Sequence, residues 1–180
     1  MTFASKKILP LVLAVVLGIS SAAAQPSDVP SRREVLAAIE TLRTRFLSPD
    51  ALRAAEIVNR FVELSEDCLV VLDPEAIPWA EGAPNADPDD PQVMLRSLLL
   101  AAYFAGNTKA QLDSGKVEDM PYPGWLFVIR AYRTIQEKTD FSIPSIDELV
   151  EMEEKGTLER YERILKARRK AGPDEPAEII

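Results

Sequence analysis

"QVMLRSLLLAAYFAGNTKAQLDSG", residues 92–115, is apolar on almost every side between Leu98 and Ala105. A surface helix carries one apolar stripe, whereas a helix that is apolar all round is typical of a buried position. The apolar run is too short for a membrane span, which needs roughly 20 apolar residues. The segment therefore predicts a central buried helix, for which Asp90 supplies the cap and Pro91 the first position.

Small residues recur every four positions along this helix, at Ala102, Gly106 and Ala110. They form a shallow face on which a neighbouring backbone can approach closely. A glycine in mid-helix costs about 1 kcal/mol relative to alanine, so a packing reason is expected. The alternative is that Gly106 and Asn107 mark a break and that the helix is really two.

Two further helices are predicted before this segment. The first runs over 31–47 and opens with a capping box of Ser31 and Glu34. The second begins at Pro49 and continues to residue 72. The apolar stripe of the first helix is Val35, Ala38, Ile39, Leu42 and Phe46; that of the second is Ile57, Phe61, Leu64, Cys68 and Val71.

The helical pattern resumes after residue 115. A helix begun near Pro123 carries the stripe Trp125, Val128, Ile129, Tyr132 and Ile135, which Leu126 and Phe127 widen. Ser145 and Glu148 then predict a second capping box, and Gly156 with Thr157 divides the last segment into two helices. We therefore predict an all-α single domain, residues 31–171, of five or six amphipathic helices in a bundle or a short hairpin array. It includes a long loop, 73–90, and a disordered C-terminal tail, 172–180, follows it.

The N-terminal residues have the composition of a signal peptide. Lys6 and Lys7 precede the apolar run 8–19, and small residues then lead to a cleavage position between Ala24 and Gln25. Residues 1–24 are thus a predicted signal peptide and 25–30 a short linker. We expect a periplasmic or secreted protein with no integral membrane span after cleavage.

Composition excludes several classes of function. The formal charge is −8 and becomes −10 without the two leader lysines, which argues against nucleic acid as a partner. The sequence has no histidine and one cysteine, which removes histidine-based catalysis and a structural zinc site. No cofactor is predicted. Cys68 is either a buried, inert thiol or a reactive one.

Carboxylates provide two candidate sites. Asn85, Asp87 and Asp89 alternate as the first ligands of a calcium loop do, with Asp90 next to them. The glycine and the bidentate glutamate of such loops are missing, which favours a linker that ends where Asp90 caps the next helix. Glu63 and Asp67 would share one helix face, so Glu63 or Glu66 is a candidate acid for a carboxylate-dependent envelope hydrolase.

Protein binding is the remaining class of function. Trp79, in the long loop, either folds back onto the helices or is exposed for recognition. Arg163, Lys166 and Arg169 belong to a basic C-terminal segment that either meets an acidic partner or is a solvated face. We predict a protein-interaction or structural module of the cell envelope, whose partner is another envelope or secreted protein. An enzyme is not predicted, although the hydrolase and the calcium-stabilised module stay open as alternatives.

Overall fold

The computed structural model describes residues 29–80 and 90–171, and all regular structure within these ranges is helical. This confirms the all-α prediction. The elements are α1 (Arg32–Thr44), α2 (Pro49–Leu64), the short 3₁₀-helix η1 (Pro78–Ala80), α3 (Pro91–Ser114), α4 (Pro121–Gln136), α5 (Pro144–Glu154) and α6 (Leu158–Ala171). Within the described ranges, no helix combines the length and the apolar character that crossing a membrane requires.

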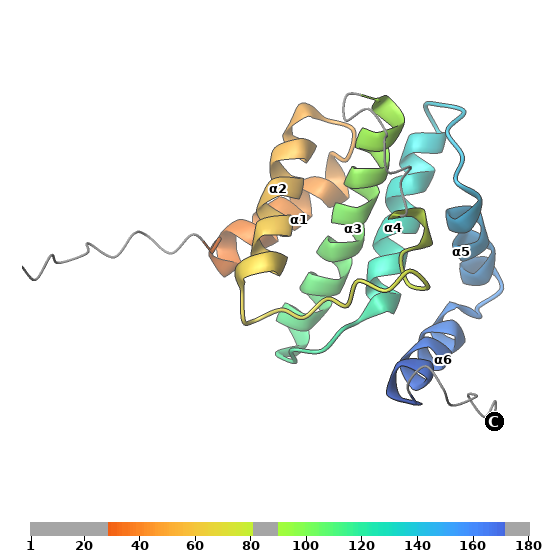
Figure 1. The fold of residues 1–180 in the computed structure, drawn as a ribbon. Coiled ribbons are helices and arrows are strands. Elements are labelled where there is room, and N and C mark those ends of the chain that lie inside the picture. Colours follow the sequence, from red (N-terminus) through yellow and green to blue (C-terminus); the bar gives the residue numbers. More distant parts are fainter. Residues whose placement is uncertain (1–28, 81–89, 172–180) are drawn as a thin grey trace, which may run out of the picture.

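Helix α3 is the centre of the fold, as its composition predicts. Figure 1 shows it between α2 on one side and α4 on the other, and α1 also contacts it. Its middle part is buried on nearly every side: Leu99, Ala101, Ala102, Tyr103 and Ala105 have no exposed surface. The helix is continuous through Gly106, so the alternative of a break at Gly106 and Asn107 is wrong.

Side-chain caps start two of the helices as predicted. The backbone N–H of Ser31 donates to the Glu34 carboxylate at 2.8 Å, and the N–H of Glu34 donates to Ser31 Oγ at 3.3 Å. These are the two bonds of a capping box. Asp90 accepts from the N–H of Gln92 at 2.8 Å and so caps α3.

The second predicted capping box does not form. Helix α5 begins at Pro144 instead of after Ser145, and Ile143 occupies the cap position without a side-chain bond. Proline at the first helical position places the start two residues earlier than predicted, because its fixed φ suits that position. Gly156, with φ +68°, separates α5 from α6 as predicted.

The second helix is shorter than predicted. It ends at Leu64, whose side chain is 43% exposed, so the predicted stripe through Leu64, Cys68 and Val71 is wrong. Ser65 accepts the N–H of Asp67 at 3.1 Å, which turns the chain out of the helix. The face of α2 that packs inward consists mostly of small residues instead. Its buried residues are Ala51, Ala54, Ala55, Val58 and Phe61.

Residues 68–72, which we call the strap, follow this turn and lead toward η1 without helical structure. In Figure 1 the strap crosses the C-terminal part of α3 as a yellow segment. Helix α5 lies beside α4, and α6 lies below α5 near the end of the strap. The strap and α6 thus cover the same end of the bundle.

Candidate functional site

Helices α3 and α4 approach each other through two glycines. A Cβ on Gly106 would lie 2.3 Å from the Pro123 carbonyl oxygen and 2.9 Å from the Cα of Gly124. Real Cβ atoms do not come within 3.0 Å of such atoms, so only glycine fits at this crossing. The packing reason predicted for Gly106 is therefore confirmed.

A groove of about 510 Å³ lies along this contact, and we call it the α3–α4 groove. Its floor is apolar, because Leu126 and Phe127 are half-buried in it and Ile129 is 2% exposed. The sequence pattern places Leu126 and Phe127 in a widened packing stripe, whereas both remain partly accessible. The complete lining is Gly106, Lys109, Ala110, Asp113, Pro123, Leu126, Phe127, Ile129, Arg130, Arg133 and Glu153.

The charged rim of the groove is partly neutralised. Lys109 Nζ lies 2.6 Å from the Asp113 carboxylate, and Arg133 lies 3.1 Å from Glu153 on α5. Arg130 is exposed and its side chain makes no ion pair or hydrogen bond with any residue that the structure describes. The groove therefore combines an apolar floor with one uncompensated positive charge.

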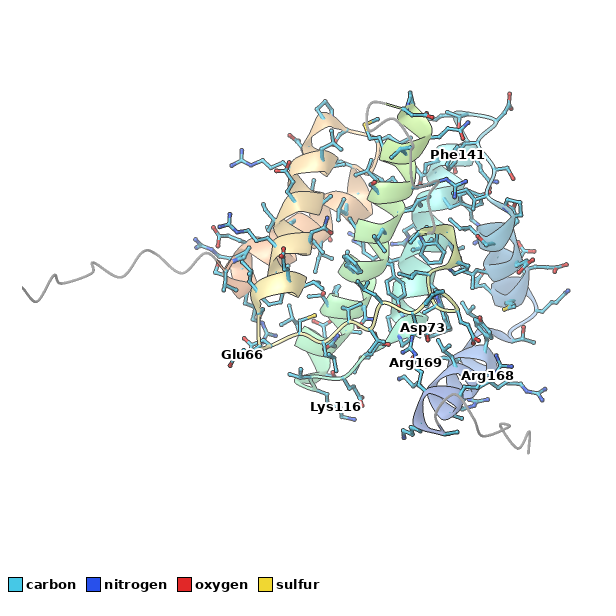
Figure 2. The ribbon with its side chains drawn as sticks, in the orientation of Figure 1. Glu66, Asp73, Lys116, Phe141, Arg168 and Arg169 are labelled. Atoms are coloured by element: carbon cyan, nitrogen blue, oxygen red, sulfur yellow. The ribbon has the colours of Figure 1, made fainter. Side chains whose placement is uncertain are left out.

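A polar cluster lies on another face of the same C-terminal half of α3, beneath α6. Arg169 donates to Asp73 through Nε at 2.7 Å and to Asp119 through Nη1. The Asn107 amide donates to the same Asp119 carboxylate at 2.7 Å. Figure 2 shows Arg169 and Asp73 next to each other where α6 meets the end of the strap. These bonds join three distant parts of the chain.

The same cluster holds the strap in place. Gln111 accepts the N–H of Leu69 at 3.0 Å and donates to the Leu69 carbonyl at 2.7 Å. The N–H of Val71 donates to Asp119 at 3.2 Å. The side-chain amide of Gln111 thus gives Leu69 the pair of bonds that a neighbouring strand would give.

Burial and charge set the titration of this cluster. Burial lowers the pKa of Arg169, but its bonds to Asp73 and Asp119 outweigh that effect and raise the pKa overall. Burial, with the nearby negative charge of Asp119, raises the pKa of Tyr103. Tyr103 Oη has no hydrogen-bond partner in the described part of the chain. We call the cluster of Arg169, Asp73, Asp119, Asn107 and Gln111 the clamp. Arg169, and Tyr103 close to it, stay protonated at neutral pH.

The single cysteine matches the inert alternative. Cys68 is 8% exposed, and its sulfur lies 3.2 Å from Thr108 Oγ1. Burial raises the pKa of the thiol, which lowers the fraction of reactive thiolate.

The residues predicted for protein binding have different environments. Trp79 has no exposed surface and packs edge-on against Tyr103 at 6.0 Å, so it folds back and does not present its side chain to a partner. Lys166 pairs with Glu162 at 3.2 Å, and Arg169 belongs to the clamp. Arg163 is exposed and makes no ion pair with the described residues.

The carboxylates predicted for catalysis or calcium binding do not form a common site among the described residues. Glu63 and Glu66 are exposed, and α2 ends before Asp67, so the predicted shared helix face of Glu63 and Asp67 is wrong. Asp90 is occupied as the cap of α3, while Asp87 and Asp89 lie outside the described residues. Among the described residues no group of three or more side chains is arranged to hold a metal ion.

Sequence reasoning missed the residues that build the clamp: Asn107, Gln111 and Asp119. A signal exists in hindsight, since Asn107 and Gln111 are four apart on a helix that is otherwise apolar in its middle. Buried polar side chains need hydrogen-bond partners. Two of them on one face of a central helix indicate that a polar backbone segment packs there.

Comparison with protein-family models, curated proteins and solved structures finds no significant match to this chain. The described residues form an all-α fold with a central helix, α3, that the strap crosses, and with a groove between α3 and α4.

Proposed function

We propose that the chain is an exported protein-binding module of the cell envelope, with the α3–α4 groove as its contact surface. The observation that carries the proposal is the apolar floor of Leu126 and Phe127, which stays accessible beside an uncompensated Arg130. Export is supported by the charged, apolar and small-residue order of the first 24 residues.

The shape of the groove favours a helical partner segment. It runs between two packed helices, and an amphipathic helix commonly lays its apolar face into such a groove. An acidic residue on that segment would meet Arg130, while the ion pairs of Lys109 and Arg133 keep the rest of the rim polar. The partner in this proposal is another envelope or secreted protein with an apolar, acidic helix.

The other two functions have less support. A hydrolase needs an acid in a controlled environment, and Glu63 and Glu66 are exposed side chains at the end of α2. A calcium module needs free carboxylate oxygens, whereas one oxygen of Asp90 is occupied by the N–H of Gln92.

The test places a photo-crosslinking amino acid at Leu126 in cells that express the full-length gene. We expect a discrete crosslinked product with one partner protein, identified by mass spectrometry. The same amino acid at Leu52, which is 46% exposed on α2, is the matched control and should give no such product.

Two variants separate the groove from general effects. Ala110→Arg fills the groove, and Arg130→Glu reverses its free charge without touching the core. Both should lower the crosslinked yield at least about tenfold, because burial of an apolar anchor and a charge pair together contribute that much. Leu52→Arg should leave it unchanged. Equal yields from Leu126 and Leu52, or a yield that Arg130→Glu does not lower, would contradict the proposed surface.

A further inference from the structure

The strap has one edge that is occupied and one that is not. Its inner edge is held by side chains, because the N–H and carbonyl of Leu69 bond to Gln111 and the N–H of Val71 bonds to Asp119. Bonding of alternate amides toward one side is typical of an extended chain.

The alternate residues, Val70 and Leu72, belong to the outer edge of the strap. The N–H groups of Val70 and Leu72, and their carbonyl oxygens, make no hydrogen bond with any residue that the structure describes. A free row of N–H and C=O groups on an extended segment is a template for an added strand. The composition of residues 69–72, "LVVL", suits a strand as well.

Exposed apolar side chains accompany this edge. Leu72 is 65% exposed and Leu69 is 49% exposed, although both are large aliphatic residues. In Figure 2 Glu66 and Asp73 lie near the two ends of the strap, and Lys116 lies below it on the turn that follows α3. The edge therefore offers apolar contacts together with its backbone groups.

The charges near the outer edge of the strap indicate which kind of strand would bind there. Glu66 and Asp67, which directly precede the strap, are exposed acids whose side chains have no partner among the described residues. A second copy of the chain would bring a second set of the same acids to the edge, which like-charge repulsion disfavours. A strand with basic residues is attracted instead.

We propose that residues 69–72 form a β-addition site for an extended segment of another protein, in which apolar and basic residues alternate. Val70 and Leu72 supply the backbone bonds, the exposed Leu72 the apolar contact, and Glu66 and Asp67 the selectivity. This site is separate from the α3–α4 groove, so either surface stands if the other fails.

The experiment uses the protein purified after expression of the full-length gene and a ten-residue peptide of alternating valine and lysine. Binding is measured by calorimetry, and amide hydrogen exchange is followed by NMR. A peptide with alternate backbone amides N-methylated keeps the side chains but removes the donors, and is the peptide control. Leu72→Ser tests the edge without adding a charge, and Leu52→Ser at the 46% exposed Leu52 is the protein control.

The expected result is binding that weakens with salt, with slower exchange at the amides of Val70 and Leu72. Leu72→Ser should raise Kd about tenfold, as expected for the loss of one apolar anchor, and Leu52→Ser should not. Equal binding of the N-methylated peptide, or no binding at about 1 mM peptide, would overturn the proposal. Concentration-dependent self-association that protects the same two amides would replace the peptide with a second copy and so overturn it too.

Discussion

The substitution Gly106→Ala tests the helix contact that forms the groove. The new Cβ would lie 2.3 Å from the Pro123 carbonyl oxygen, whereas ordinary contacts begin at 3.4 Å. Helix α4 must therefore move by about 1 Å or α3 must bend, since the obstacle is backbone and cannot rotate away. Alanine also has a higher helix propensity than glycine, which stabilises α3. The change in the free energy of unfolding is therefore the difference between a steric cost and a propensity gain.

The steric term is the larger of the two. Overpacking of a core typically costs about 1–3 kcal/mol. Because the obstacle to the new Cβ is backbone, we expect a steric cost of about 3 kcal/mol for Gly106→Ala. The propensity gain is about 1 kcal/mol. The net loss is then about 2 kcal/mol, which lowers Tm by about 4–8 °C for a chain of this size.

Urea unfolding followed by tryptophan fluorescence measures this loss, because Trp79 and Trp125 are both fully buried. Gly115→Ala is the matched control: its φ of +68° strains alanine, but nothing lies within 4 Å of the added Cβ. It should lose about 1 kcal/mol from backbone strain alone. A Gly106→Ala protein as stable as the wild type would show that α3 and α4 are not in close contact at this point.

Two further predictions concern the clamp and the first capping box. Asp119→Ala should lower the free energy of unfolding by about 3 kcal/mol, because it leaves the Arg169 guanidinium without one of its two carboxylates; Asp113→Ala, which breaks an exposed pair, should cost under about 1 kcal/mol. Hydrogen bonds from Ser31 hold the pKa of Glu34 below its usual value, so this stabilisation is present at neutral pH and is lost as the pH falls through the lowered pKa. Glu34→Gln should therefore destabilise the protein at pH 7 more than at pH 3, as urea unfolding at both pH values will show.

The central position of α3 is predictable because burial on all sides leaves a plain signature in composition. Its apolar run from Leu98 to Ala105 has no polar face to expose, and the structure buries it accordingly. Gly106 is predictable for a related reason, since an unfavourable residue in mid-helix implies a compensating contact.

The strap is not predictable from local pattern. Cys68 and Val71 continue the helical spacing of α2, so periodicity alone extends the helix through them. What ends the helix is the Ser65 turn together with bonds from Gln111 and Asp119, which lie more than 40 residues away in sequence. Long-range partners of this kind override local propensity, and neither periodicity nor composition reports them.

The charges of the C-terminal helix show the same limit. The sequence pattern predicts that Arg168 and Arg169 belong to a basic face that could meet an acidic partner. In the structure the chain itself supplies the acidic residues. Arg169 meets Asp73, and Arg168 meets Glu75 at 3.0 Å. Of the predicted Arg163, Lys166 and Arg169, Arg163 is the one that stays exposed without an ion pair to a described residue.

Helix α3 serves both proposed surfaces from neighbouring faces. Successive residues in an α-helix are about 100° apart, so Gly106 and Ala110 face α4 and the groove while Asn107 and Gln111 face the clamp and the strap. The bonds of Gln111 to Leu69 use the inner edge of the strap, which is why its outer edge remains for an added strand. Because the two proposed surfaces use different faces of one helix, a helical segment in the groove would not exclude a strand at the strap.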